Sequence, residues 1–329
     1  MGGIEVFPPE IIREILLKVA TVKSLLRLPS SFLVLINKET ISKAVDVLFH
    51  KFVFSNALVL ENPLQLPRPY KFWIIGSCNG LVCLVEDGKH DAVFIYNPAT
   101  RRSNCLPIES VSSSGFYCYG FGYDKVSNDY KVVITETGSN MATTTRILSL
   151  NSGEWKEGGQ FPCGYPNDDG KLLNGAIHWA AGRNNSSGSW KIVSLDLAKE
   201  TYGEVLQPKY PEGHEYSELG VAGEWLCVLG GYVEKCVVDI WVMKVYGVKD
   251  SWTKLASIPY PHTWYDQILA PFYISEHGKL MLKFGRQLAI YDSKDSSSSV
   301  TDNLIECLEA CTVVESLVSP FGLAGNNDR

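Results

Sequence analysis

The stretch GSCNGLVCLVEDGKHDAVFIYNPATRRSNCLP, residues 76–107, has an organisation that the rest of the chain repeats. It opens with a glycine-rich turn. Two short apolar runs follow, Leu81–Val85 and Val93–Tyr96, separated by turns rich in Gly, Asp, Asn and Pro. Apolar runs of this length between such turns are typical of strands in an antiparallel meander. A single meander cannot bury its own faces in water, so we expect further copies of the unit to pack against it.

Three more units end in the same way, with a proline after the last apolar run. The closing residues are Pro107, Pro162, Pro208 and Pro259, which lie 55, 46 and 51 residues apart. A fifth unit, from Leu280 to Tyr291, lacks the proline. A period of ~40–50 residues with several strands in each unit is the signature of β-propeller blades. The sequence therefore predicts a mainly-β fold built as a propeller.

The propeller also has to close, because an open stack of sheets would leave strand edges unpaired. Two spare apolar runs, Phe52–Leu60 and Thr312–Val318, lie at opposite ends of the chain, and we expect them to build a last blade together. This gives about six blades over residues 51–320, with five and seven as the alternatives. Residues 321–329 are expected to form a flexible C-terminal tail.

Residues 1–50 have a different pattern. Apolar residues recur at helical spacing between residues 10 and 18, directly after Pro8-Pro9. Further short helices are expected at Lys23–Leu28, Phe32–Ile36 and Ile41–Phe49. A helical segment of this size is small for an independent core, so a partner or the neighbouring domain is expected to cover it.

Composition and charge narrow the possible partners. The chain has a net charge of −6 at pH 7, which disfavours nucleic acid and anionic membranes because both require a basic face. No apolar run reaches the ~18 residues of a membrane-spanning helix, and the N-terminus lacks the pattern of a signal peptide. The nine cysteines and six histidines are scattered without metal-ligand spacing, so we expect free thiols, no metal and no cofactor. The expected location is cytoplasmic, nuclear or both.

Three motifs with possible chemistry have simpler structural explanations. Residues 76–80 have the form of a nucleophile elbow with Cys78 in place of serine, but no helix can follow, so a tight turn between strands is expected. The sequence around Gly120 and Gly122 lacks the third glycine of a dinucleotide fingerprint. The acidic residues that could supply paired carboxylates are read as turn residues: Asp124, Asp129, Asp168 and Asp169. We therefore expect no catalytic residue and no enzyme.

Binding through loops is the better prospect, because propeller loops gather on two faces of a rigid scaffold. Aromatic residues with a polar end are frequent interface anchors, and the segment after Pro259 is dense in them. The candidate substrate-binding residues are Tyr260, His262, Trp264 and Tyr265. The alternative is that Trp264 or Tyr265 packs between blades. Lower-ranked loop candidates are Tyr165, Tyr210 and Tyr216, whereas Trp155 and Trp252 are expected to be core packing residues.

The N-terminal pattern FPPEIIREILLK, followed by VKSLLRL, resembles a plant F-box. The resemblance implies helices that bind a Skp-type adaptor and, through it, a cullin of a ubiquitin ligase. The matching, adaptor-binding positions are Pro8, Glu10, Ile11, Ile15, Leu16, Val22, Leu25 and Leu26. The alternative is a helical cap packed on the domain behind it. Two stretches, residues 19–21 and 29–34, depart from the F-box pattern.

The remainder of the chain carries the second half of this resemblance. The motifs GSCNGLVCL, YNPATRRSNCLP, GFGYDKVSNDYKVV, LNGAIHW and IVSLDLAKETYGEV resemble, in order, the F-box-associated, kelch-like domain of plant F-box proteins. The resemblance implies a non-catalytic substrate receptor whose propeller binds a protein substrate, still unknown, for ubiquitination. The alternative is a decayed F-box, which would leave a propeller interaction module without ligase function.

Overall fold

The computed structural model of the chain describes residues 31–36, 57–60, 72–86, 88–108, 115–182, 190–214, 216–259, 268–274, 279–284, 287–292, 305–306, 309–314 and 316–321. Strands dominate these residues and form five four-stranded antiparallel sheets and one three-stranded sheet. The expected mainly-β propeller with about six blades is confirmed. The adaptor-binding positions predicted between Pro8 and Leu26 lie outside the described residues.

Each four-stranded sheet is one blade made from consecutive strands. Blade one contains β3 (Phe72–Cys78), β4 (Leu81–Glu86), β5 (Ala92–Asn97) and β6 (Arg102–Pro107). Blade two contains β7 (Phe116–Asp124), β8 (Asp129–Thr137), β9 (Thr143–Ser149) and β10 (Trp155–Gln160). Blade three contains β11 (Lys171–Leu173), β12 (Ala176–Ala181), β13 (Lys191–Asp196) and β14 (Thr201–Val205).

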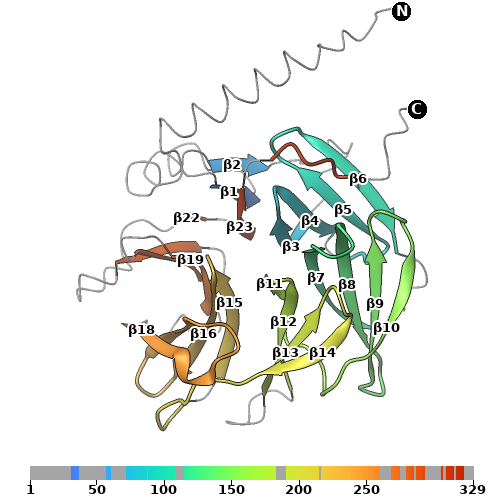
Figure 1. Cartoon of the computed structure of the whole chain (residues 1–329). Helices are drawn as coiled ribbons and strands as arrows, with labels where there is room; N and C mark the ends of the chain where they lie inside the picture. Colours follow the sequence, from blue (N-terminus) through green and yellow to red (C-terminus); the bar gives the residue numbers. More distant parts are fainter. Residues whose placement is uncertain are drawn as a thin grey trace, which may run out of the picture.

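Blades four and five repeat this order. Blade four contains β15 (Tyr216–Ala222), β16 (Trp225–Tyr232), β17 (Val237–Met243) and β18 (Trp252–Pro259), with the short 3-10 helix Lys249–Ser251 before β18. Blade five contains β19 (Ile268–Ile274), β20 (Lys279–Phe284), β21 (Gln287–Asp292) and β22 (Ile305–Glu306). The first strand of each blade lies nearest the centre of the ring and contacts the first strand of a neighbouring blade (Figure 1).

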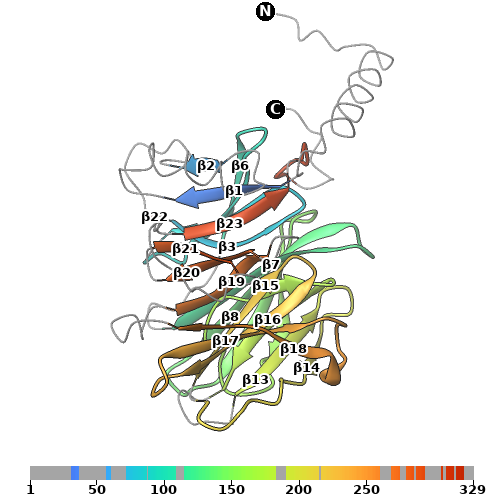
Figure 2. The same cartoon turned by 90° about the vertical axis from the view of Figure 1, so that its left-hand side faces the viewer.

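The three-stranded sheet closes the ring with both ends of the chain. Strand β1 (Ser31–Ile36) pairs in parallel with β2 (Ala57–Leu60) and antiparallel with β23 (Glu309–Val314) (Figure 2). The two spare runs expected to close the ring are Phe52–Leu60 and Thr312–Val318, and residues 57–60 and 312–314 of them do lie in one sheet. Strand β1 joins them there.

The helix expected at Phe32–Ile36 is wrong, because these residues form β1. A short run such as SFLVLI cannot be assigned to a helix or a strand by periodicity alone, and its hydrogen-bond partners lie far away in sequence. Strand β1 thus lies N-terminal to the boundary predicted at residue 50. The division of the chain at that residue stays a prediction.

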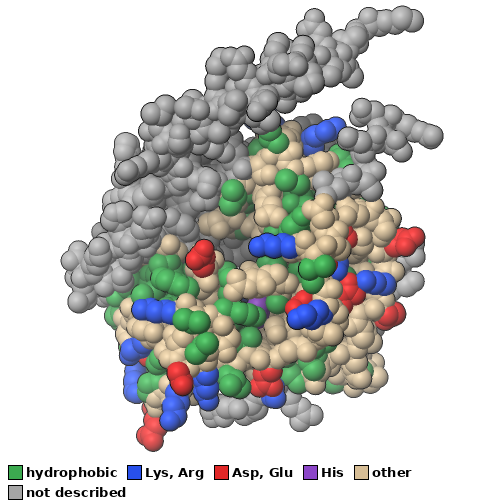
Figure 3. Space-filling model, viewed as in Figure 1, with side chains coloured by type: hydrophobic (Ala, Val, Ile, Leu, Met, Phe, Trp, Pro, Cys, Tyr) green, Lys and Arg blue, Asp and Glu red, His purple; other side chains and the backbone are tan. Residues whose placement is uncertain are grey.

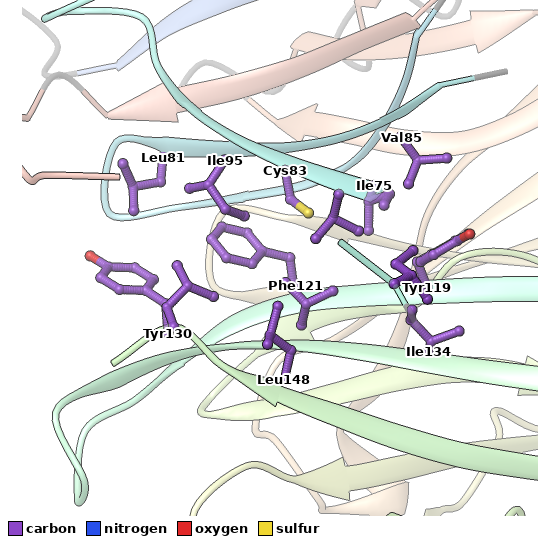
Figure 4. Close-up of a cluster of buried hydrophobic side chains, with 14 of the residues drawn as sticks. Ile75, Leu81, Cys83, Val85, Ile95, Tyr119, Phe121, Tyr130, Ile134 and Leu148 are labelled. Carbon is purple, nitrogen blue, oxygen red and sulfur yellow. The ribbon is translucent and has the colours of Figure 1, made fainter. Parts of the chain in front are cut away.

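Buried side chains fill the spaces between blades. Between blades one and two, Leu81, Cys83 and Ile95 face Phe121 and Leu148, and all five are fully or almost fully buried (Figure 4). Burying a side chain of this size contributes ~1.5–3 kcal/mol relative to leaving it exposed. The sheets are therefore held face to face by a continuous apolar layer.

Two tryptophans fasten neighbouring blades at their outer strands. Trp155, the first residue of β10, donates its Nε1–H to the carbonyl of Pro107 at 2.9 Å. Trp252, the first residue of β18, donates in the same way to the carbonyl of Leu206 at 2.8 Å. Trp252 is buried and Trp155 packs against the core between blades one and two. Their predicted packing role is confirmed.

The segment that follows β23, residues 316–321, crosses blade one and is called the strap. The side-chain amide of Asn97 donates to the carbonyls of Ser316, at 3.0 Å, and Val318, at 2.7 Å. Asn104 donates to the carbonyl of Pro320 at 3.3 Å. The strap therefore fastens the closing sheet to blade one (Figure 1).

Candidate functional site

The blade topology brings the connections between blades to one face of the propeller. Because successive strands are antiparallel, the connection that enters each blade and the connection between its second and third strands lie at the same end. We call this end the inter-blade face. Among the described residues it includes 88–91, 138–142, 161–170, 206–214 and 233–236. Acidic and basic side chains are interspersed on the side of the molecule shown in Figure 3.

An aromatic cluster joins blades one and two at this face. His90, in the β4–β5 connection, lies with Nδ1 2.7 Å from the hydroxyl of Tyr119 and its ring centroid 4.6 Å from that of Tyr117. Tyr117 donates its hydroxyl to Glu136 Oε1 at 3.0 Å. Burial raises the pKa of Tyr119, so it stays a neutral phenol. The cluster therefore fixes the position of the connection relative to the first strand of blade two.

The loop 161–170 is tied to blades two and three along its length. Asp169 Oδ1 accepts a hydrogen bond from the backbone N–H of Tyr119 at 2.7 Å, and Gly170 N–H donates to the carbonyl of Tyr119 at 2.6 Å. Asn167 N–H donates to the carbonyl of Ala180 at 2.8 Å, and Asn167 and Asp168 remain exposed. Asp169 therefore has a structural role, and the loop presents polar groups on a fixed backbone.

A second aromatic group fixes the loop that enters blade four. The rings of Tyr210 and His214 stack at 4.0 Å with an angle of 4° between their planes. His214 Nε2 lies 2.7 Å from Ser217 Oγ. Lys235 Nζ lies over the ring of Tyr232, 5.3 Å from the ring centroid. Two loop candidates, Tyr165 and Tyr210, thus lie on this face, whereas for Tyr216 the structure describes only the backbone, at the first position of β15.

Large apolar side chains are exposed where the first two blades begin. Trp73 is the second residue of β3, Phe116 is the first residue of β7, and Met141 lies in the β8–β9 connection. Exposed aromatic residues beside fixed polar loops are suited to anchoring a protein partner. The candidates chosen from the sequence do not include these three residues. The pair Phe72-Trp73 carries a signal, because adjacent residues of a strand point to opposite faces and one of the two rings can therefore be exposed. In the structure Phe72 is buried and Trp73 is exposed.

Residues 31–319 match the family model of the F-box associated beta propeller domain. The chain belongs to this family. It is 30% identical over 280 residues to an F-box/kelch-repeat protein of Arabidopsis thaliana, covering 82% of this chain and 75% of that protein. It is 28% identical over 295 residues to the F-box protein CPR1 of the same plant, covering 79% and 70%. An Arabidopsis thaliana F-box/WD-40 repeat-containing protein is 28% identical over 292 residues, covering 77% and 69%.

The predicted substrate-binding residues of this F-box-associated propeller lie outside the described residues. Tyr260, His262, Trp264 and Tyr265 belong to the connection between β18 and β19, which enters blade five. The described residues on either side, Pro259 and Ile268, end and begin strands at the inter-blade face. Their role in binding stays a prediction.

Two of the motifs with possible chemistry, residues 76–80 and the glycines at positions 120 and 122, form a turn and part of a strand in the F-box-associated propeller. Asn79 and Gly80 form the hairpin turn between β3 and β4 with φ of 49° and 89°, as the analysis of residues 76–80 predicts. Burial raises the pKa of the Cys78 thiol to about 12, so it stays protonated. Gly120 and Gly122 lie inside β7, where side chains of blade three pack against them.

Two further features of the described residues concern metal ions and membranes. In the part of the chain that the structure describes, no group of three or more His, Cys, Asp or Glu residues is placed to hold a metal ion. Within the same residues, no helix is long and apolar enough to cross a membrane.

Proposed function

We propose that this chain is the substrate-recognition subunit of a Skp–cullin–F-box ubiquitin ligase. Two observations support the proposal: the chain belongs to the F-box-associated propeller family, and residues 7–28 resemble an F-box. In this proposal the N-terminal segment binds a Skp-type adaptor and, through it, a cullin. The propeller binds a protein substrate. The compartment is the cytoplasm, the nucleus or both.

The chain itself carries no catalytic group in this mechanism. Other subunits transfer ubiquitin, and the propeller accelerates transfer by holding the substrate at a high effective concentration beside them. The inter-blade face suits this role because its loops are fixed by cross-blade contacts. The starts of β3 and β7 expose apolar anchors there, Trp73 and Phe116. A fixed binding surface loses little conformational entropy when a partner binds.

The adaptor half of the proposal is tested by co-purification of the full chain with a Skp-type adaptor. We expect the adaptor to be retained and to be lost when Leu16→Asp places a charge on the apolar side of the first predicted helix. Val126→Asp is the matched control, because Val126 is exposed on blade two, outside the N-terminal segment. No adaptor bound to the unmodified chain, while an intact F-box protein binds under the same conditions, would contradict the proposal.

The substrate half is tested by comparing captured proteins by mass spectrometry. A substrate should be captured by the unmodified chain and lost with Trp73→Ala plus Phe116→Ala. A second double variant, Trp264→Ala plus Tyr265→Ala, tests the connection between β18 and β19. Val245→Ala is the control, because Val245 is exposed in the β17–β18 connection at the opposite end of the strands. A capture profile unchanged in both double variants would rule out this face.

A decayed F-box is the second candidate function. The resemblance places the end of the F-box after Leu28, but residues 31–36 form β1 of the closing sheet. Residues 31–36 are then not available for adaptor binding, and the protein would act as a propeller interaction module. Fusing an intact F-box before residue 31 separates the two functions: adaptor binding that appears only in the fusion supports decay.

A further inference from the structure

Three large apolar side chains are exposed along the strap and at the end of β23. Val314, Leu317 and Phe321 are all exposed, and Leu317 is exposed to 77%. We call these three residues the strap patch. The strap beneath them is held in place by the hydrogen bonds from Asn97 and Asn104, so the patch is a fixed surface. Covering such fixed apolar groups with another apolar surface removes them from water and lowers the free energy.

Strand β1 begins at the end of β23 that carries Val314, one of the patch residues. Strand β1 is antiparallel to β23, with Ser31 opposite Val314 and Ile36 opposite Glu309. Residues that precede Ser31 thus enter β1 at the end of β23 where the strap begins.

The residues that enter β1 match the patch in character. The stretch VKSLLRL, residues 22–28, has four apolar residues in seven and is followed by Pro29. A segment this short cannot bury those side chains by itself. We propose that residues 22–28 dock on the strap patch when no adaptor is bound, and that a Skp-type adaptor competes with the patch for Leu25 and Leu26. The competition rests on the proposed adaptor function, whereas the docking does not.

Docking would regulate adaptor binding. A segment that is docked for most of the time binds an adaptor more weakly, in proportion to the fraction that is free. Burying one leucine side chain shifts such an equilibrium by about ten-fold or more. The strap patch would therefore set the adaptor concentration at which the complex assembles.

Hydrogen exchange of the full chain tests the docking without any adaptor. We expect the amides of residues 22–28 to be protected, and Leu317→Ser to speed their exchange by about ten-fold. Val126→Ser is the control, because Val126 is 83% exposed on blade two and should leave the exchange unchanged. Unprotected amides in the unmodified chain, or equal exchange in both variants, would overturn the docking.

Titration with a Skp-type adaptor tests the competition. Leu317→Ser should tighten adaptor binding several-fold relative to Val126→Ser, because the segment is released from the patch. Equal affinities combined with faster exchange would overturn the competition and leave the docking standing. Absence of adaptor binding to every variant would contradict the proposed function, and the exchange measurement would still decide the docking.

Discussion

The buried ammonium group of Lys131 contacts carboxylates of blades two and three. Its Nζ lies 2.9 Å from Asp124 Oδ2 and 2.8 Å from Glu200 Oε1, and it donates to the carbonyl of Leu197. Lys131→Met leaves both carboxylates without this partner, so we expect the free energy of unfolding to fall by about 3 kcal/mol in urea denaturation. Lys156→Met is the control, since Lys156 also pairs with Glu200 but its side chain is 54% exposed and should cost less than about 1 kcal/mol. Equal losses would show that burial does not set the strength of these pairs.

The charge on Asp124 predicts how stability depends on pH. Burial raises the pKa of Asp124, but hydrogen bonds from Ser127 and Lys131 outweigh burial and lower the pKa from 3.8 to about 2. Because the folded pKa is depressed, this stabilisation is fully present above pH 3.8 and is lost as the pH falls towards 2. Asp124→Asn should therefore flatten the dependence of the unfolding free energy on pH in this window. An unchanged slope between pH 4 and pH 2.5 would contradict the assignment.

At the scale of the element, the β3–β4 turn shows why a glycine is required. Gly80 has φ of +89°, and a Cβ there would lie 2.3 Å from Ser316 Cβ and 2.9 Å from the carbonyl oxygen of Val314. Gly80→Ala should therefore lower the free energy of unfolding by about 2–4 kcal/mol, through backbone strain together with the clash. Gly88→Ala is the control. Gly88 has φ of +72°, but a Cβ there would have no atom within 4 Å, so this variant measures only the backbone strain, which costs about 1 kcal/mol. Equal effects on the thermal midpoint would rule out the contact with the strap region.

The elements that the sequence predicts well are those with local signals. Turns and closing prolines mark the blades, and Pro107 and Pro259 are indeed the last residues of β6 and β18. Strand β1 has no such signal, since its pairing with β23 joins residues that are far apart in the chain. The same limit applies to the inter-blade face. Trp73 and Phe116 lie at the same end of two blades only when the ring forms, and no local pattern encodes that surface.

At the scale of the whole molecule, stability depends on how the ring is closed. Asn97 is completely buried, and it has two separate tasks. Its Oδ1 accepts hydrogen bonds from the backbone of Ala99 and Thr100 and forms the β5–β6 turn, while its Nδ2 donates to the strap. The amide therefore couples a turn inside blade one to the last residues of the ring.

Asn97→Asp separates the two tasks, because a carboxylate still accepts the turn hydrogen bonds but cannot donate to the strap. We expect the free energy of unfolding to fall by about 2–4 kcal/mol, since two donated bonds are lost and the carboxylate then faces two carbonyl oxygens. Hydrogen exchange should accelerate first in residues 309–321, before the interior of blade two. Asn104→Asp is the matched control because it removes a single, longer bond to the strap, and its cost should be about 1 kcal/mol. If Asn97→Asp accelerated exchange evenly across all blades, the strap would not be the point at which the ring opens.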